Sequence, residues 1–293
     1  MTAEITVSFP EKQSLGSLYT AERQFPHTRK WIGDAKGKLS LTCAADRMLG
    51  VALSSAGWDP ASQLSATDLN CLSSIDFSTC QFNERTFRPS TQMAELVEVR
   101  LDFLKLSDAD LRLLKQLPHL RTVWLTGASI TDGGMSEFKE LPAICNLVLK
   151  STAISDQGLA NIGNIPTLEI LNLPAQITDA GLPSLKQLTA LRRLDLSFTK
   201  VTDAGLKQLA ALPTLTELYL NDTGIGDSGL ENLAALPGLK ILFLSGTEVS
   251  DAGITRLEQL SKLEHLELRD TRATENGLAR LRAKLPHCAI FGP

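Results

Sequence analysis

The sequence lacks the features that mark membrane proteins, exported proteins and nucleic-acid-binding proteins. No apolar run is long enough to span a bilayer. The first residues show no basic segment followed by an apolar one, so we expect no signal peptide. Lys and Arg number 29 against 33 Asp and Glu, which gives a formal net charge of -4. Because phosphate binding needs clustered basic residues, we expect no nucleic-acid partner.

Signals of catalysis and of metal binding are also missing. The five cysteines are odd in number and irregularly spaced, which indicates reduced thiols in a cytoplasmic protein. No Cys or His pair has the spacing of a zinc site. No nucleophile, His and acid recur in the pattern of a hydrolytic triad. We therefore expect no enzyme activity, no cofactor and no metal.

What the sequence does contain is a repeat with a period of 24 residues. The block from Leu191 reads LRRLDLSFTKVTDAGLKQLAALPT, and the blocks from Leu215 and Leu239 follow the same pattern. Nine blocks begin at Leu72, Leu96, Leu120, Ile144, Leu168, Leu191, Leu215, Leu239 and Leu263. The first block lacks the Asp-x-Gly-Leu element, and the block at Leu168 is one residue short at Pro174-Ala175-Gln176.

Each block combines a strand pattern with a helix pattern. In the block at Leu191, the leading leucines favour the inner side of a short strand, and the hydroxyl of Thr199 can satisfy loop backbone groups. We expect Thr202 and Asp203 to cap a helix. The helix itself is indicated by Leu206, Leu209 and Leu212, and ends at Pro213. Strands stack at about 4.8 Å and helices at about 8–10 Å, so we expect the array to curve.

Residues 72–290 resemble the leucine-rich repeat family, in particular the bacterial subtype with T-x-[IV]-T-D-A-G-L, as in the segment from Thr199 to Leu206. The resemblance implies an α/β leucine-rich-repeat solenoid. Such a fold is a curved horseshoe with a parallel β-sheet on its concave face and helices on its convex face. It says little about function.

Outside the regular blocks, residues 1–46 show alternating β-forming stretches at Ile5–Phe9, Leu18–Thr20 and Lys38–Cys43, with turn chemistry at Gly37. We interpret them as an antiparallel β element that caps the array, with a separate ligand-binding domain as the alternative. Residues 47–71 are a transition, with a strand at Leu49–Leu53 and a short helix from Asp59. Residues 72–293 form the repeats, closed by a last strand within Leu285–Phe291.

Positions that the repeat pattern leaves free identify a candidate surface. Aromatic and charged residues at these positions are predicted to cluster on the concave face of neighbouring strands, as protein-binding hot spots do. The alternative is that aromatic residues merely suit strands. Trp124 is either a second anchor or packs under the N-terminal element. His265 either senses pH or lies on an ordinary solvated face. The candidate partner-binding residues are Trp124, Phe198, Tyr219, Ile241, Phe243, Arg193, Asp195, Glu217, His265 and Glu267.

Two further motifs are explained by the repeat. Gly224, Gly226 and Gly229 match G-x-G-x-x-G, the dinucleotide-binding fingerprint, but Gly229 is the glycine that recurs in most blocks. The aspartates that recur with the period could hold cations, yet each is accounted for as a helix cap, and the ligand number that calcium needs is missing. This ladder is Asp132, Asp156, Asp179, Asp203, Asp227 and Asp251.

The sequence therefore predicts a cytoplasmic, non-enzymatic module that binds another protein on the concave face of its repeats. The alternative is a scaffold or immunity-type subunit whose N-terminal β element makes the specific contact. The short block at Leu168 helps to discriminate between them. A break in the strand ladder there would indicate a face shaped for a ligand, whereas an undisturbed sheet would make the deletion neutral.

Overall fold

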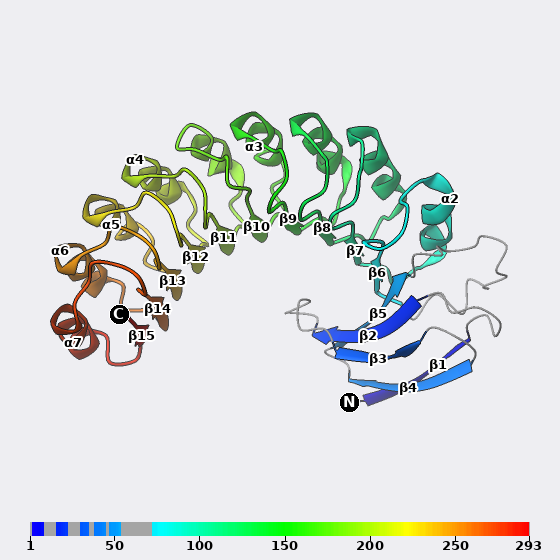
Figure 1. Cartoon of the computed structure of the whole chain (residues 1–293), viewed down its shortest axis with the longest axis horizontal. Helices are drawn as coiled ribbons and strands as arrows, with labels where there is room; N and C mark the ends of the chain where they lie inside the picture. Colours follow the sequence, from blue (N-terminus) through cyan, green and yellow to red (C-terminus); the bar gives the residue numbers. More distant parts are fainter. Residues whose placement is uncertain are drawn as a thin grey trace. The chain divides into compact units, whose positions relative to one another are not determined.

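The computed structural model describes residues 2–8, 16–22, 30–34, 38–44, 47–53 and 72–292 (Figure 1). It divides into two compact units. The first holds residues 1–129 with 140–144, and the second holds residues 130–139 with 145–293. The predicted turn at Gly37 and the predicted helix from Asp59 lie outside the described residues. No helix in the described ranges is long and apolar enough to cross a membrane.

The first unit begins with antiparallel strands. Strands β1 (Thr2–Ser8) and β4 (Lys38–Ala44) pair with each other in a two-stranded sheet. In a second sheet, β2 (Gly16–Glu22) lies between β3 (Lys30–Asp34) and β5 (Arg47–Leu53), antiparallel to both. The sequence predicted the strands at β1, β2, β4 and β5 but missed β3. The proposed domain boundaries at residues 46 and 71 stay predictions.

Strand β5 also begins the parallel part of this sheet. It pairs in parallel with β6 (Ser74–Asp76), which continues through β7 (Glu98–Arg100) to β8 (Thr122–Trp124). The predicted strand at Leu49–Leu53 is therefore confirmed as the strand that leads into the array. Short helical segments lie between the parallel strands: α2 (Glu84–Phe87), η1 (Arg88–Gln92) and η2 (Asp108–Gln116).

The second unit is a regular array in which each strand pairs in parallel with the next, residue opposite residue one repeat on. Its strands are β9 (Asn146–Val148), β10 (Ile170–Asn172), β11 (Arg193–Asp195), β12 (Glu217–Tyr219), β13 (Ile241–Phe243), β14 (His265–Glu267) and β15 (Ala289–Phe291). Within this unit the strands line the inner side of an arc and the helical segments its outer side (Figure 1). β15 is the predicted last strand.

Helical segments of the second unit are short and partly 3-10. They are η3 (Asp132–Glu140), α3 (Asp156–Ile162), η4 (Leu182–Gln187), α4 (Asp203–Leu206), η5 (Lys207–Ala211), α5 (Asp227–Leu233), α6 (Asp251–Ile254), η6 (Thr255–Gln259) and α7 (Glu275–Lys284). The block at Leu191 was expected to form one helix, but it divides into α4 and η5. A 3-10 turn rises about 2.0 Å per residue, so it covers the remaining length with few residues.

The core lies between the strands and the helical segments. Both leucine groups of the pattern are buried, as Leu194 and Leu209 illustrate with no exposed surface. The repeated threonine acts as predicted, because its hydroxyl donates to the carbonyl of the last strand-side leucine. Thr199 Oγ1 donates to Leu196 O at 2.6 Å, and Thr223 and Thr247 repeat this bond to Leu220 and Leu244. This bond satisfies a buried loop carbonyl in each block.

Thr202 occupies the N-cap position of α4 and Asp203 its first turn, as predicted, but the side chain of the repeated aspartate bonds to the next repeat and not to its own helix. Asp179 accepts two hydrogen bonds from Thr202 of the next repeat, from the backbone N at 2.8 Å and from Oγ1 at 2.6 Å. The same bonds join Asp132 to Ser155, Asp156 to Thr178, Asp227 to Ser250 and Asp251 to Thr274. We call this series the carboxylate ladder. It ties each repeat to its neighbour beside the start of the helical segments.

The ladder also explains the repeated glycine. A Cβ atom at Gly205 would lie 2.2 Å from Asp179 Oδ1, and one at Gly181 would lie 2.4 Å from Asp156 Oδ1. The preceding repeat's carboxylate therefore occupies the space that a side chain would need. Aspartate and glycine recur together because one repeat's glycine makes room for the previous repeat's aspartate.

The short block leaves the sheet intact. β10 pairs in full register with β9 and with β11, so the missing residue does not break the ladder of strands. The shortening falls in the loop after the strand, between Leu173 and Ile177. In most other blocks of the array this loop contains one residue with positive φ, such as Phe198 or Gly246. The short block lacks that residue. Since the sheet is undisturbed, this agrees with the prediction that the deletion is neutral.

Candidate functional site

The candidate surface is the inner strand face of the second unit. On β11, β12 and β13 the middle residue is a buried leucine, and the residues on either side of it are half-buried. These flanking residues include Arg193, Asp195, Glu217, Ile241 and Phe243, which the sequence placed on this face. The face is thus built from the positions that the leucine pattern leaves free.

Four rings stack in a continuous row across this face. Tyr219 and Phe243 are parallel, with ring centroids 4.8 Å apart. His265 stacks on Phe243 at 5.0 Å, and Phe291 follows His265 at 5.0 Å. We call these four side chains the ring row. It joins β12, β13, β14 and β15, because neighbouring parallel strands lie close enough for large side chains to meet.

An arginine lies at each end of the ring row. The Arg193 guanidinium is 5.8 Å from the Tyr219 ring centroid, and the Arg269 guanidinium is 5.9 Å from the Phe291 ring centroid. Both distances allow cation–π attraction. Each arginine also pairs with a carboxylate, Arg193 with Glu217 and Arg269 with Glu267, the latter at 2.9 Å between Nε and Oε1. Each end ring of the row therefore has an ion-paired guanidinium group beside it.

The electrostatics at the Tyr219 end keep the hydroxyl protonated and the arginine charged. Burial, with a further contribution from Glu217, raises the pKa of Tyr219 to about 12 although Arg193 acts in the opposite direction. The Tyr219 hydroxyl donates to Glu217 Oε2 at 3.3 Å. Burial lowers the pKa of Arg193, but the hydrogen bond to Glu217 and the nearby charges outweigh it, so its pKa is raised overall.

Asp195 belongs to a neighbouring polar cluster. Its Oδ1 accepts from Lys150 Nζ at 3.0 Å, and its Oδ2 accepts from Asn172 Nδ2 at 3.1 Å. Lys150 also donates to Ser197 O at 3.0 Å. The cluster spans three repeats and includes Lys150, which the strand pattern did not single out because it follows β9.

Phe198 was predicted to join the aromatic cluster but lies apart from it. It follows β11 in the loop, is 64% exposed and has a φ of 66°. Within the described part of the chain it makes no ring–ring contact. Its backbone N donates to Asn221 O at 2.8 Å, so the left-handed loop is held by the next repeat. Phe103, the equivalent residue of an earlier block, is 73% exposed with a φ of 60°, and sequence reasoning missed it.

Trp124 lies in the first unit. The Arg100 guanidinium lies 3.9 Å from the centroid of its ring. Arg100 Nε donates to Glu98 Oε1 at 3.1 Å, and the same oxygen accepts from Ser74 Oγ at 2.8 Å. Because Ser74 uses its proton there, the Tyr19 hydroxyl donates to Ser74 Oγ at 2.6 Å. We call this series the buried polar chain. Tyr19, on β2, links the N-terminal strands to the strand face of the first repeats.

Sequence reasoning left the role of His265 open and missed two other residues of the surface. His265 was listed as a candidate partner-binding residue, and its ring stacks between those of Phe243 and Phe291. Phe291 was overlooked because the search for equivalent free positions on successive strands stopped at Glu267. Phe291 occupies the same position one period further along the chain. Arg269 lies beyond the end of β14, where strand alternation no longer predicts direction.

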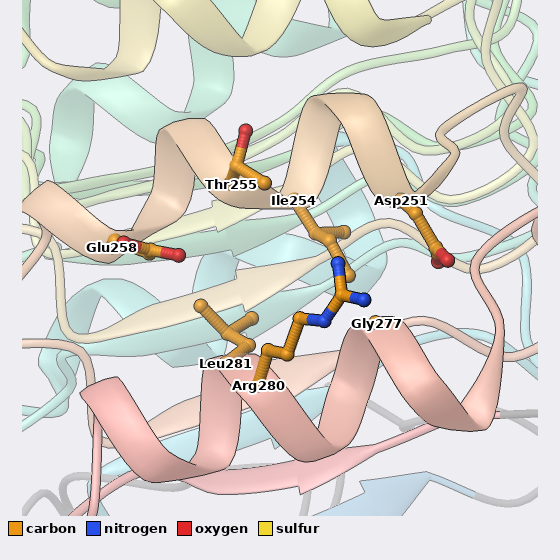
Figure 2. A pocket seen from close by; sticks show the side chains of 7 residues that line it. All are labelled: Asp251, Ile254, Thr255, Glu258, Gly277, Arg280 and Leu281. Atoms are coloured by element: carbon orange, nitrogen blue, oxygen red, sulfur yellow. The ribbon is translucent and has the colours of Figure 1, made fainter.

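The helical side of the second unit contains a small pocket. Figure 2 shows this pocket between α6–η6 and α7, where Arg280 extends toward Asp251. The backbone and then the side chain of Thr274 lower the pKa of Asp251 by hydrogen bonding, and Arg280 lowers it further. Asp251 is therefore already engaged as part of the carboxylate ladder. Among the described residues, no group of three His, Cys, Asp or Glu side chains could hold a metal ion.

Two of the described thiols, Cys80 and Cys288, are not activated. Burial and the charge of Asp76 raise the pKa of Cys80 to about 11, and burial raises that of Cys288 to about 11. Both are free thiols. A thiol with such a pKa is protonated at neutral pH and is therefore a poor nucleophile.

Comparison with known proteins identifies two segments of the repeat array. Residues 187–210 and 211–234 match the family profile described as Leucine Rich repeat. These two segments are leucine-rich repeats, and the array has the leucine-rich-repeat fold. The matched residues include β11 and β12, so Arg193 and Tyr219 lie within recognised leucine-rich repeats.

Two solved structures are similar to this chain. Internalin C2 of Listeria monocytogenes is 23% identical, covers 64% of this chain and 84% of its own, and has a TM-score of 0.48. The internalin InlF of Listeria monocytogenes is 18% identical, covers 78% of this chain and 82% of its own, and has a TM-score of 0.44. No curated protein matches the sequence.

Proposed function

We propose that this protein binds another protein through the inner strand face of its second unit. The observation that carries this proposal is the ring row, in which four large rings remain only partly covered after folding. Aromatic side chains with an arginine beside them are the residue types that dominate protein-binding hot spots. Because the rings are held by stacking and by the strands, little conformational entropy is lost when a partner covers them.

The supporting argument is the charge arrangement around the rings. Ion pairs flank the row at Glu217 and Glu267, which gives a partly desolvated centre with a polar border. The leucine framework needs none of these side chains, since the core is filled from the buried positions. We therefore assign to them a role in binding, with no chemistry of their own.

Capture of the partner from a lysate of the source organism tests the proposal. The Tyr219→Asp, Phe243→Asp double variant places two charges in the ring row. A matched control, Ala210→Asp with Ala235→Asp, places two charges at exposed positions on the helical side. Circular dichroism first establishes that all three proteins are folded.

We expect wild type and the helical-side control to retain the same partner, identified by mass spectrometry, and the ring-row variant to lose it. Equal capture by all three proteins would refute the placement on the strand face. It would favour a second candidate, the edge strand β3, because Trp31 on that strand is 55% exposed.

A further inference from the structure

Stacking covers the ring faces inside the ring row, so the ring edges are what a partner can reach. Phe243 is covered on one face by Tyr219 and on the other by His265, and His265 lies between Phe243 and Phe291. The Arg193 guanidinium lies beside the Tyr219 ring, and that of Arg269 lies beside the Phe291 ring. Between the rings of the row, a further flat group would have to displace an existing neighbour before it could stack. A partner therefore meets ring edges, which carry the positive part of the aromatic quadrupole.

The charges on the same face are matched within the chain. Glu217 pairs with Arg193, Glu267 with Arg269, and Asp195 with Lys150. Three cations and three carboxylates thus compensate one another. The pairs are partly exposed, with Arg193 and Glu217 each 23% exposed, and Arg269 63% exposed beside Glu267 at 11%. A partner that brought its own charge here would find no unpaired charge to meet it and would bury that charge without compensation, which is costly.

The length of the ring row limits the size of the segment that can cover it. Its centroid spacings of 4.8, 5.0 and 5.0 Å give a span of at most about 15 Å. An extended chain rises about 3.3 Å per residue, so about five residues would cover the row. The complementary groups for ring edges are backbone carbonyl oxygens and the faces of aromatic side chains, and apolar side chains gain by covering the exposed carbon.

Resting on the proposed function, we propose that the strand face takes an extended, uncharged apolar segment of the partner protein, about five residues long, laid across β12 to β15. Its carbonyl oxygens and aromatic or aliphatic side chains lie on the edges of the ring row. The three ion pairs remain formed on either side of it. Recognition is thus by shape and apolar contact, with the paired charges acting against charged competitors.

Selection from a phage-displayed library of random linear peptides of about 12 residues tests this assignment. The full chain is the target, and one enriched peptide is then synthesised for measurement of Kd. We expect the enriched peptides to share an uncharged stretch with aromatic or aliphatic residues. Because exposed charge attraction is screened by salt, Kd should change less than about twofold between about 50 and about 500 mM NaCl.

Two variants separate the contribution of the rings to peptide binding from that of charged residues. Phe243→Ala opens the middle of the row and should weaken peptide binding by about tenfold or more. Arg256→Gln with Glu231→Gln removes an exposed ion pair on the helical side, and should leave Kd within about threefold. Phe291→Ala, at the last strand, provides a second ring variant if Phe243→Ala does not fold.

Enrichment of charged peptides, a steep salt dependence, or no enriched peptide whose binding needs the ring row would each overturn the inference. If the lysate partner is still lost in the ring-row double variant, the proposed function stands and only the partner's chemistry is wrong. If that partner is held equally by all proteins, both proposals fail.

Discussion

The two units join neighbouring repeats at different places on the same framework. In the first unit the buried polar chain runs along the strand face from Tyr19 through Ser74 and Glu98 to Arg100. In the second unit the polar ties lie beside the start of the helical segments, as the carboxylate ladder. The strand face of the second unit has only partly exposed polar ties, such as those of Asp195, and carries the ring row. The leucine pattern fills the core in both units but does not determine which face holds the polar ties.

Two equivalent glutamates make this difference measurable. Glu98 and Glu217 occupy the same position of their repeats and each pairs with an arginine. The side chain of Glu98 is 1% exposed, whereas that of Glu217 is 23% exposed. A partly exposed pair is worth little, while a buried pair is costly to break. The glutamate–arginine pair is therefore expected to contribute to stability in the first unit much more than in the second.

The largest expected effect follows from this pair. Glu98→Ala removes the acceptor of two buried donors, Ser74 Oγ and Arg100 Nε, and should lower the free energy of unfolding by about 3–5 kcal/mol. Glu217→Ala, the matched control, should lower it by less than about 1 kcal/mol. Urea unfolding followed by circular dichroism measures both. Equal losses would show that burial does not distinguish the two units.

Breaking the carboxylate ladder should have the next largest effect. In Gly205→Ala the new methyl group would lie where Asp179 Oδ1 now lies, so both bonds from Asp179 to Thr202 must break. Hydrogen bonds to a charged acceptor are worth about 1.5–3 kcal/mol each, and we expect a loss of about 2–4 kcal/mol in urea unfolding. Gly238→Ala is the control, because its added methyl group meets nothing closer than 3.6 Å. A similar loss in both variants would contradict the assigned role of the aspartate.

A substitution that completes the ladder should raise stability. At Asp203 the next repeat offers only the Gly226 backbone N, at 2.7 Å, because glycine has no hydroxyl. Gly226→Ser restores the missing donor at a position with extended backbone and room for a Cβ. We expect a gain of about 1 kcal/mol in the free energy of unfolding. Gly226→Ala separates the hydroxyl from the loss of glycine, and a gain of the same size there would show that the hydroxyl contributes nothing.

The repeat pattern was enough to predict strands, core and curvature because these depend on residues within one block. The pairing of Leu194 with Leu218 follows from the period alone, and the Thr199 hydroxyl has its acceptor three residues away. The side-chain partners of the aspartates were not predicted because they lie 23 residues further on, as Asp179 and Thr202 show. Aspartate is also common at helix N-termini, so its position could be explained within a single block without reference to the next repeat.

The candidate surface could be predicted only where side-chain direction follows from strand alternation. This holds for Tyr219 and Phe243, whose stacking was expected from neighbouring strands. His265 comes from the other free position of its strand, and only its ring orientation brings it between Phe243 and Phe291. Rotamer choices of this kind depend on all neighbours at once. The polar ties of the first unit were hidden for the same reason, since Tyr19 and Ser74 are 55 residues apart.

The smallest expected effect concerns Phe198, and it also separates stability from binding. A φ of 66° is unfavourable for a bulky side chain, and the equivalent position is Asp222, Gly246 or Asp270 in the following repeats. Phe198→Asn should therefore raise the free energy of unfolding by about 0.5–1 kcal/mol, measured in urea.

The matched substitution in the first unit is Phe103→Asn, for which we expect a smaller gain. There the ring lies over Gly127, since a Cβ at that glycine would be 2.5 Å from the Phe103 ring, and the substitution loses this contact. If Phe198→Asn is more stable but captures less partner, the strained phenylalanine contributes to the binding surface beside the ring row. If stability rises and capture is unchanged, Phe198 lies outside that surface, and the surface is confined to the strands.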